Sequence, residues 1–324
     1  MQTEHIIGLS LLGAGAFLLL ASLLLSYICY YKTFYSPKSL EKRNRPVVDK
    51  SSLVFIQNMD TLDGWKNEVR RLEYKKVSIT SFDGLKLVGK YYEIKKGAPI
   101  DIIFHGYRGS ADRDMDGHLL RSVNSGRNVL AVDQRASGES DGCTITFGIN
   151  ESKDCKDWVD FVVENIDKDA KIVLMGVSMG AATVLTASAF DLPKNVVAAI
   201  CDCGYTSAKE IIMSKMKDMH LNPKFFFPFA ALGAKIFGHF DIGESSPFLS
   251  MPNAKIPILF IHGKADDFVP FEMGRLNYNA CASKKQFVEF ERVGHASSYL
   301  LFPDKYRLAT EEFLNPILYE EKQN

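Results

Sequence analysis

The sequence lacks a net charge and has few cysteines. Its 39 basic and 39 acidic residues cancel, which argues against a general nucleic-acid-binding protein, because such proteins carry a basic excess. Six cysteines in 324 residues exclude a small disulfide-dense domain. The chain also has no internal repeat and no low-complexity tract. With 46% hydrophobic and 24% charged residues it is neither disordered nor collagen-like.

Charge is also missing from one long stretch near the N-terminus. No charged residue occurs from Ile6 to Tyr31, and about 20 apolar residues suffice to cross ~30 Å of hydrocarbon. Tyr27 and Tyr30 lie near its end, where aromatic rings favour the membrane interface. The alternatives are a signal peptide, which would need a positive n-region and a shorter run, and a buried core helix, which would show polar periodicity. We therefore expect residues 1–31 to form one transmembrane anchor.

Basic residues lie on only one side of this stretch. Those that follow it are Lys32, Lys38, Lys42, Arg43 and Arg45, and no lysine or arginine precedes it. The positive-inside rule then predicts a single-pass membrane protein with its C-terminal domain in the cytoplasm. Apart from Cys29 in the anchor, the cysteines are odd in number and have no framework spacing, which suits a reducing compartment.

The remaining chain alternates between short apolar and longer amphipathic segments. Residues 32–70 are a basic, polar connection followed by an amphipathic helix. Strands are predicted at 75–80, 85–94, 100–105, 128–133, 171–175, 196–202, 256–262 and 285–290, and helices at 113–124, 150–165, directly after Ser178, and 303–313. Asp83-Gly84 is a hairpin signal, and Asn150 is a plausible N-cap. This order predicts an α/β fold for residues 71–324, with a mainly parallel sheet and helices on both faces.

The alternation is interrupted at about residues 205–255, which are too many for one crossover. The stretch includes KEIIMSKMKDMH and FFFPFAALGAKIFGHF. We expect a helical cap inserted over one edge of the sheet. Its aromatic residues either pack the cap onto the domain only or also line a substrate pocket.

A nucleophile motif follows the strand at 171–175. Gly176-Val177-Ser178-Met179-Gly180 has the pattern G-x-S-x-G and opens a small-residue helix. The pattern alone is weak, but the strand–turn–helix setting is the one that the motif requires. Both glycines must lack side chains because a Cβ would clash across the sharp turn. The following helix directs its N-terminal dipole toward a developing oxyanion.

A serine needs a base, and the base needs an orienting carboxylate. His295 follows the last predicted strand and is the best-placed base, whereas His105 and His262 lie in His-Gly dipeptides that suit structural hydrogen bonds. Asp266, in the loop after the penultimate strand, fits best as the carboxylate; the alternatives are Asp267 and Asp202. The predicted catalytic residues are therefore Ser178, Asp266 and His295.

Two backbone N–H groups are needed to hold an oxyanion. Met179 supplies one because it follows the nucleophile. We assign the second to Tyr107 in the loop His105-Gly106-Tyr107-Arg108-Gly109, whose glycines allow a close approach of the backbone. Whether the Tyr107 side chain touches a substrate is left open by the sequence.

Together these motifs resemble the α/β-hydrolase superfamily over about residues 70–316. The elbow GVSMGAA, the loops HGYRG and HGKADDFVP, the run DQRASGESDG and the order Ser, Asp, His all match that superfamily. The chain looks most like bacterial, membrane-anchored serine hydrolases of the cinnamoyl/feruloyl esterase-like and serine aminopeptidase-like branch. It departs from them at Ser137, where related sequences often have histidine.

The resemblance implies hydrolysis of an acyl bond without a metal or an organic cofactor. Cys201 and Cys203 form C-x-C, which is not a zinc pattern, and are expected to be buried small residues in or beside a strand. We expect a serine esterase acting on carboxylic esters or thioesters, with the bilayer and a small acyl ester as partners and no nucleic acid. A peptidase or amidase with the same triad is the alternative, and a non-enzymatic binding protein of this fold is the third hypothesis.

Overall fold

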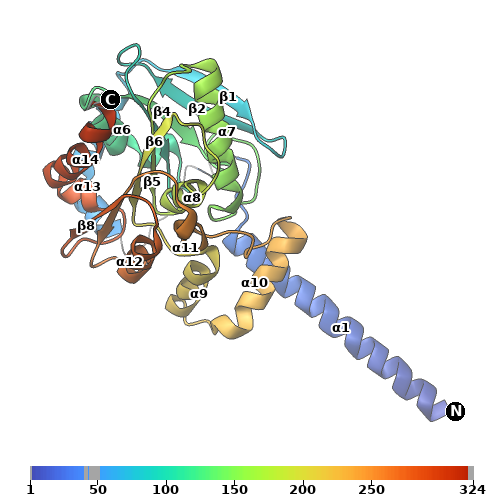
Figure 1. The fold of residues 1–324 in the computed structure, drawn as a ribbon. Coiled ribbons are helices and arrows are strands. Elements are labelled where there is room, and N and C mark those ends of the chain that lie inside the picture. Colours follow the sequence, from blue (N-terminus) through green and yellow to red (C-terminus); the bar gives the residue numbers. More distant parts are fainter. Residues whose placement is uncertain (1, 40–42, 44–51, 320–324) are drawn as a thin grey trace.

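A mixed eight-stranded sheet forms the centre of the molecule (Figure 1) in a computed structural model that describes residues 2–39, 43 and 52–319. Its strands are β1 (Lys75–Thr80), β2 (Lys86–Tyr92), β3 (Ile100–Phe104), β4 (Asn128–Asp133), β5 (Ile172–Val177), β6 (Val196–Asp202), β7 (Ile258–Gly263) and β8 (Lys285–Phe290). Their order is β1-β2-β4-β3-β5-β6-β7-β8. β2 is antiparallel to β1 and β4, and the strands from β4 to β8 are parallel. The predicted strands and their mainly parallel arrangement are confirmed.

Helices cover both faces of the sheet, which explains why β3, β5 and β7 are buried along their whole length. The helices of the body are α3 (Ser52–Gln57), α4 (Met59–Val69), α5 (Ala111–Asp114), α6 (Asp116–Asn124), α7 (Ile149–Asn165), α8 (Met179–Ala187), α12 (Phe271–Ala280), α13 (Ser298–Leu301) and α14 (Pro303–Leu318). Trp158 of α7 and Val184 of α8 belong to the core on one face. Leu119 of α6 and Phe313 of α14 belong to the core on the other.

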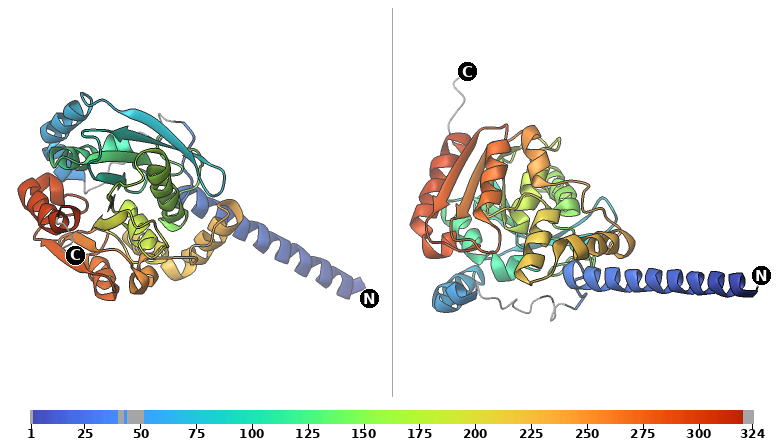
Figure 2. Two further views of the ribbon diagram at one scale, coloured as in Figure 1. Left: turned by 45° about the horizontal axis from the view of Figure 1, so that its top comes forward. Right: turned by 90° about the horizontal axis from the view of Figure 1, so that it is seen from below.

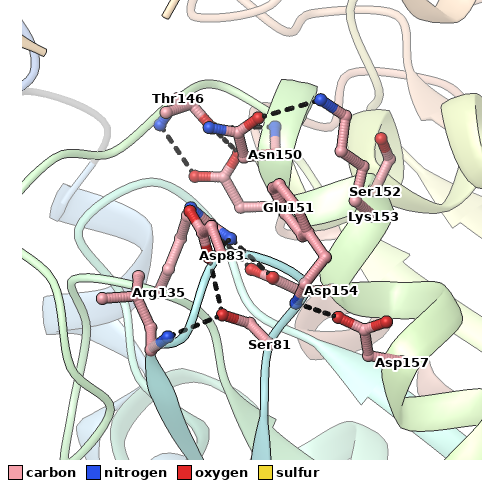
Figure 3. Close-up of polar contacts among 12 residues, drawn as sticks. Ser81, Asp83, Arg135, Thr146, Asn150, Glu151, Ser152, Lys153, Asp154 and Asp157 are labelled. Atoms are coloured by element: carbon pink, nitrogen blue, oxygen red, sulfur yellow. Dashed lines mark hydrogen bonds and ion pairs between the residues drawn. The ribbon is translucent and has the colours of Figure 1, made fainter. Parts of the chain in front are cut away.

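The start of α7 differs from the prediction. Asn150 is not the N-cap; Gly148 is, with a φ of 87°, and the helix begins at Ile149. The Glu151 carboxylate accepts hydrogen bonds from the N–H groups of Gly148 at 2.8 Å and Thr146 at 2.7 Å (Figure 3). The glutamate at the third helical position thus bonds the N–H of the N-cap residue, as in a capping box, while Asn150 lies inside the first turn and donates its own N–H to Thr146 Oγ1 at 2.9 Å.

Arg135, in the loop after β4, joins the β1–β2 hairpin to α7. Its guanidinium donates to both oxygens of Asp154, at 2.7 and 2.6 Å, and to Asp83 at 2.8 Å (Figure 3). Burial lowers the pKa of Arg135, but the hydrogen bonds to Asp154 and Asp83 outweigh it and raise the pKa. The guanidinium therefore stays charged, and its bidentate contact with Asp154 fixes the loop. Arg135 thus gives part of the run DQRASGESDG a structural role.

The N-terminal helix projects from the body. α1 (Gln2–Thr33) is one continuous helix, and every residue from Leu9 to Ala21 is exposed (Figures 1 and 2). Leu9–Thr33 is long and apolar enough to cross a membrane. The described part of the chain contains one such helix, in the stretch where the sequence predicts an anchor.

The C-terminal end of α1 is packed in the body of the molecule. Tyr30 and Phe34 are 5% and 0% exposed and pack in the core that contains Met179 and the cap. Ile145 donates its N–H to the carbonyl of Phe34 at 2.8 Å. The last turns of α1 therefore carry large apolar side chains that are buried in the body.

The basic residues after α1 are not equivalent. The guanidinium of Arg43 donates to the carbonyls of Gly138 at 3.1 Å and of Ser140 and Gly142 at 2.6 Å, so this charge is held inside the protein. Two further members of the predicted cluster, Lys42 and Arg45, lie outside the described residues. The predicted amphipathic helix of this region is α4.

The residues between β6 and β7 form a helical layer beside the end of α1 (Figure 1). They include α9 (Ala208–Asp218), α10 (Pro223–Phe237), α11 (Pro247–Ser250) and the 3-10 helix η1 (Met251–Asn253). Asn222 caps α10 by accepting a hydrogen bond from the N–H of Lys224, and Pro223 occupies its first turn. We call residues 203–257 the cap segment.

Candidate active site

Ser178 stands on a sharp turn between β5 and α8. Its backbone has φ 56° and ψ −114°, a conformation that is strained for a residue with a side chain. A Cβ on Gly176 would lie 2.1 Å from the carbonyl oxygen of Gly180, and one on Gly180 would lie 2.1 Å from that of Phe104. The predicted need for both glycines is therefore confirmed, because each alternative side chain would collide with backbone.

His295 lies between the serine and a carboxylate. Its Nε2 is 2.9 Å from Ser178 Oγ, and its Nδ1 is 2.8 Å from Asp266 Oδ2. The three residues come from the turn after β5, the loop after β7 and the loop after β8. The structure thus brings together the three side chains that the sequence singled out, in the order required for proton transfer from serine to histidine.

Asp266 is held as a carboxylate. Its Oδ1 accepts the N–H groups of Phe268 at 3.0 Å and Val269 at 2.8 Å. Burial raises its pKa, but the charge of His295 and hydrogen bonds from His262 and His295 outweigh this and lower the pKa below 3.8. An ionised Asp266 favours the tautomer in which His295 presents a basic Nε2 to the serine.

The two alternative carboxylates differ from Asp266 in position. Asp267 is exposed. Asp202 is 1% exposed at the end of β6, and burial raises its pKa to about 6, against smaller lowering effects of His262 and Tyr306. Among the three candidates, Asp266 is the one whose carboxylate meets the Nδ1 of His295.

The loop after β3 approaches the serine from the other side. A Cβ on Gly106 would lie 3.5 Å from the Cβ of Ser178, so the backbone of this loop borders the nucleophile. Met179 is fully buried at the first position of α8. The side chain of Tyr107 points to α1, where its hydroxyl donates to the carbonyl of Thr33 at 2.7 Å. Burial raises the pKa of Tyr107, which keeps this hydroxyl a donor.

Contacts at this loop tie the site to α1, and sequence reasoning misses them. The guanidinium of Arg108 donates to the carbonyls of Lys32 at 3.0 Å and Tyr35 at 3.2 Å. The bonds to Lys32 and Thr33 satisfy carbonyls of the last turn of α1, which helices otherwise leave unpaired, and the bond to Tyr35 holds the residues just after it. No local pattern reveals such contacts, because Lys32 and Arg108 are far apart in the sequence.

The cap segment contacts the acid loop. The ring of Phe268 lies 4.9 Å from that of His295, and the ammonium of Lys215 on α9 lies 4.3 Å above the Phe268 ring. Lys215 also donates to the carbonyl of Asp267 at 3.2 Å. The cap therefore packs against the loop that carries the carboxylate.

The two histidines of the His-Gly dipeptides have structural partners. His105 accepts the N–H of Gln134 at 3.0 Å, and His262 bonds the carbonyl of Val269 at 3.0 Å. Both match the structural role predicted for them. Cys203 lies with Asp266 and His295 in a group whose ligand atoms are within 4.8 Å of one another. Burial raises the pKa of the Cys203 thiol, which keeps it protonated beside the two other residues.

Comparisons with known proteins agree with this geometry. A family model described as the alpha/beta hydrolase fold matches residues 102–226. The structure of the Pyrococcus furiosus esterase Pf2001 superimposes with a TM-score of 0.64 at 25% identity, covering 76% of this chain and 92% of that one. The chain therefore has the α/β-hydrolase fold, and its similarities support a hydrolase.

Two relatives extend the comparison. The Bacillus subtilis protein YqkD is 29% identical over 199 residues, which cover 61% of this chain and 65% of that protein. The rat lysophosphatidylserine lipase ABHD12 is 24% identical over 205 residues, 60% of this chain and 48% of the lipase. The matches thus span less than two thirds of either relative.

Proposed function

We propose that this protein is a membrane-anchored serine hydrolase that cleaves carboxylic esters or thioesters. The observation that carries the proposal is His295, which bonds Ser178 through Nε2 and Asp266 through Nδ1. The esterase among the similar structures supports an ester bond as the target. We place the protein with the bacterial cinnamoyl/feruloyl esterase-like and serine aminopeptidase-like branch, on the motifs quoted above.

The proposed mechanism has two acyl transfers. His295 takes the proton of Ser178 while Oγ attacks the ester carbonyl, and the N–H groups of Met179 and Tyr107 hold the oxyanion. The tetrahedral intermediate collapses, the C–O bond to the alcohol breaks, and His295 gives that alcohol its proton. Water then attacks the acyl-enzyme with His295 as base, which releases the acid and restores Ser178.

The anchor suggests the substrate class and the location. A site tied to the end of an apolar helix favours amphiphilic esters that partition into a bilayer, and the lipase among the relatives supports this. We propose a single-pass protein with the catalytic part in the cytoplasm, from the basic residues that follow the uncharged stretch 6–31. We propose no nucleic-acid partner, because the net charge is zero.

The test is Ser178→Ala in the full chain, assayed with a short-chain p-nitrophenyl ester. We expect kcat/KM to fall by at least about 10³-fold, since the nucleophile is removed. Ser39→Ala, at an exposed serine, is the control and should keep the wild-type rate. Undiminished activity of Ser178→Ala would reject the mechanism, and a faster reaction with aminoacyl anilides than with esters would favour the peptidase alternative.

A further inference from the structure

The strongest unexplained feature outside the site is the exposed apolar side of α10. Phe225, Phe229, Leu232 and Ile236 recur every three or four residues, which places them on one face of the helix. Phe225, Leu232 and Ile236 are 55%, 37% and 40% exposed. We call these four residues the α10 stripe. A soluble domain would be expected to cover such a face or to make it polar.

The other apolar face of α10 is already occupied by α1. A Cβ on Gly233 would lie 2.3 Å from the carbonyl oxygen of Ser26, so the two backbones are in direct contact. Ala230 is fully buried, and the ring of Phe237 stands edge-on to that of Tyr27 at 5.2 Å. The contact therefore joins the cap segment rigidly to the anchor, and the α10 stripe is a second, free face.

The position of this contact relative to the membrane follows from the length of the apolar part of α1. At 1.5 Å per residue, the roughly 20 residues from Ile6 to Leu25 span ~30 Å, the thickness of the hydrocarbon core. Ser26, where α10 touches α1, then lies at the boundary of that core. Figure 1 and the left view of Figure 2 show α10 lying across α1 at this end rather than alongside it. Such a helix lies close to the plane of the membrane surface.

Aromatic and basic residues agree with this level. Tyr27 and Tyr31 of α1 are 47% and 48% exposed there, as in the aromatic belt of a membrane protein. α10 contains two lysines, Lys224 and Lys235, and no acidic residue. Both lysines are exposed, and long basic side chains beside an apolar face can reach lipid phosphates.

We propose that the α10 stripe inserts into the membrane interface, so that the cap segment is a second membrane contact beside the anchor. The inference rests on α1 being the anchor of the proposed enzyme. Because the cap also contacts the acid loop, this second contact fixes how the site faces the lipid surface. With α1 as the sole membrane contact, α1 and the body could tilt together relative to the bilayer. A second contact at α10 limits that tilt.

The test places a reporter on the stripe in the full chain. Leu232→Trp and Ile236→Trp are reconstituted in vesicles of phosphatidylcholine and phosphatidylglycerol whose acyl chains carry bromine, which quenches tryptophan at short range. Leu308→Trp on α14, which is 56% exposed on the far side of the body, is the matched control. The signal of wild type, with Trp65 and Trp158, is subtracted from each.

We expect brominated lipid to quench Leu232→Trp and Ile236→Trp strongly and Leu308→Trp hardly at all, with a blue shift only for the two stripe variants. Equal, weak quenching of all three would overturn the proposal. Far-UV circular dichroism of each variant reports folding without relying on the reactivity of Ser178. The quenching needs no turnover, so a failure of this proposal is separable from a failure of the proposed esterase activity.

A functional measurement gives a second readout. Leu232→Gln combined with Ile236→Gln should keep the rate on a dissolved p-nitrophenyl ester and lose at least several-fold in rate on a long-chain ester embedded in vesicles. Leu308→Gln should change neither rate. Equal rates of the stripe variant and the control on the embedded ester would contradict a role for the stripe at the membrane.

Discussion

At the scale of single residues, the site depends on which carboxylate orients His295. Asp266 and Asp267 are adjacent in sequence, but the first is buried against His295 and the second is exposed. We predict that Asp266→Asn lowers kcat about 10³- to 10⁴-fold, because the amide favours the wrong tautomer of the imidazole. Asp267→Asn is the matched control and should be nearly neutral. Ester hydrolysis measures both, and the opposite ranking would refute the assignment.

Asp202 makes a different prediction, about stability. Burial raises its pKa in the folded state to about 6, above the ordinary 3.8, so the folded protein holds this proton more tightly than the unfolded chain. Its contribution to the free energy of unfolding is therefore complete below pH 4 and is lost as the pH rises through 6.

Replacing Asp202 by a residue that does not ionise should prevent this loss of stability at high pH. At pH 7, Asp202→Asn should unfold with a free energy about 2–3 kcal/mol higher than wild type, and at pH 4 the difference should shrink to near zero. Denaturant unfolding at both pH values measures this. Asp304→Asn, at an exposed aspartate, is the control; a gain that does not depend on pH would show that Asp202 is not the cause.

At the scale of elements, the turn between β5 and α8 brings the backbone of Gly180 into direct contact with the backbone at the end of β3. A Cβ at residue 180 would lie 2.1 Å from the carbonyl oxygen of Phe104, and backbone cannot give way as a flexible side chain can. Gly180→Ala should therefore lower the free energy of unfolding by at least about 1–3 kcal/mol, the usual cost of backbone strain, or prevent folding.

A second glycine provides the comparison. Gly64 lies in α4 with nothing within 4 Å of an added Cβ. Gly64→Ala should raise the free energy of unfolding by roughly 0.5–1 kcal/mol, since alanine favours a helix more than glycine. Thermal unfolding of the two variants should move in opposite directions, and a tolerated alanine at residue 180 would contradict the close backbone contact at this turn.

At the scale of the whole molecule, α1 serves two parts of the protein. Its residues 9–21 are exposed, and its last turns are packed in the cap and held by Tyr107 and Arg108. We predict that a chain lacking residues 2–21 folds and labels with a fluorophosphonate, whereas one lacking residues 2–36 is severely destabilised. The second loses two buried aromatic side chains, Tyr30 and Phe34, each worth about 1.5–3 kcal/mol.

The two truncations are compared by thermal unfolding and by labelling of Ser178. The shorter truncation is the control for removal of the apolar segment itself. If the chain without residues 2–36 were as stable and reactive as the chain without residues 2–21, the end of α1 would be a passive connection. That result would contradict the packing of Tyr30 and Phe34 in the body.

Local sequence patterns suffice to predict the strands, the nucleophile turn and the order of Ser178, Asp266 and His295. These features follow from period-2 or continuous apolar runs, and from glycines flanking a serine between a strand and a helix. The predicted N-cap of α7 is wrong, because the helix begins at Ile149 with Gly148 as its N-cap, and Asn150 therefore lies inside the first turn.

Other features arise only when the chain is folded. Folding selects Asp266 over its neighbour by placing one of the two in a buried contact with His295, and it joins Tyr107 and Arg108 to the end of α1. It also divides the apolar residues of α10 between a face packed on α1 and a free stripe. These outcomes depend on contacts between residues distant in the chain, and such contacts cannot be predicted from composition or periodicity, which describe only local sequence.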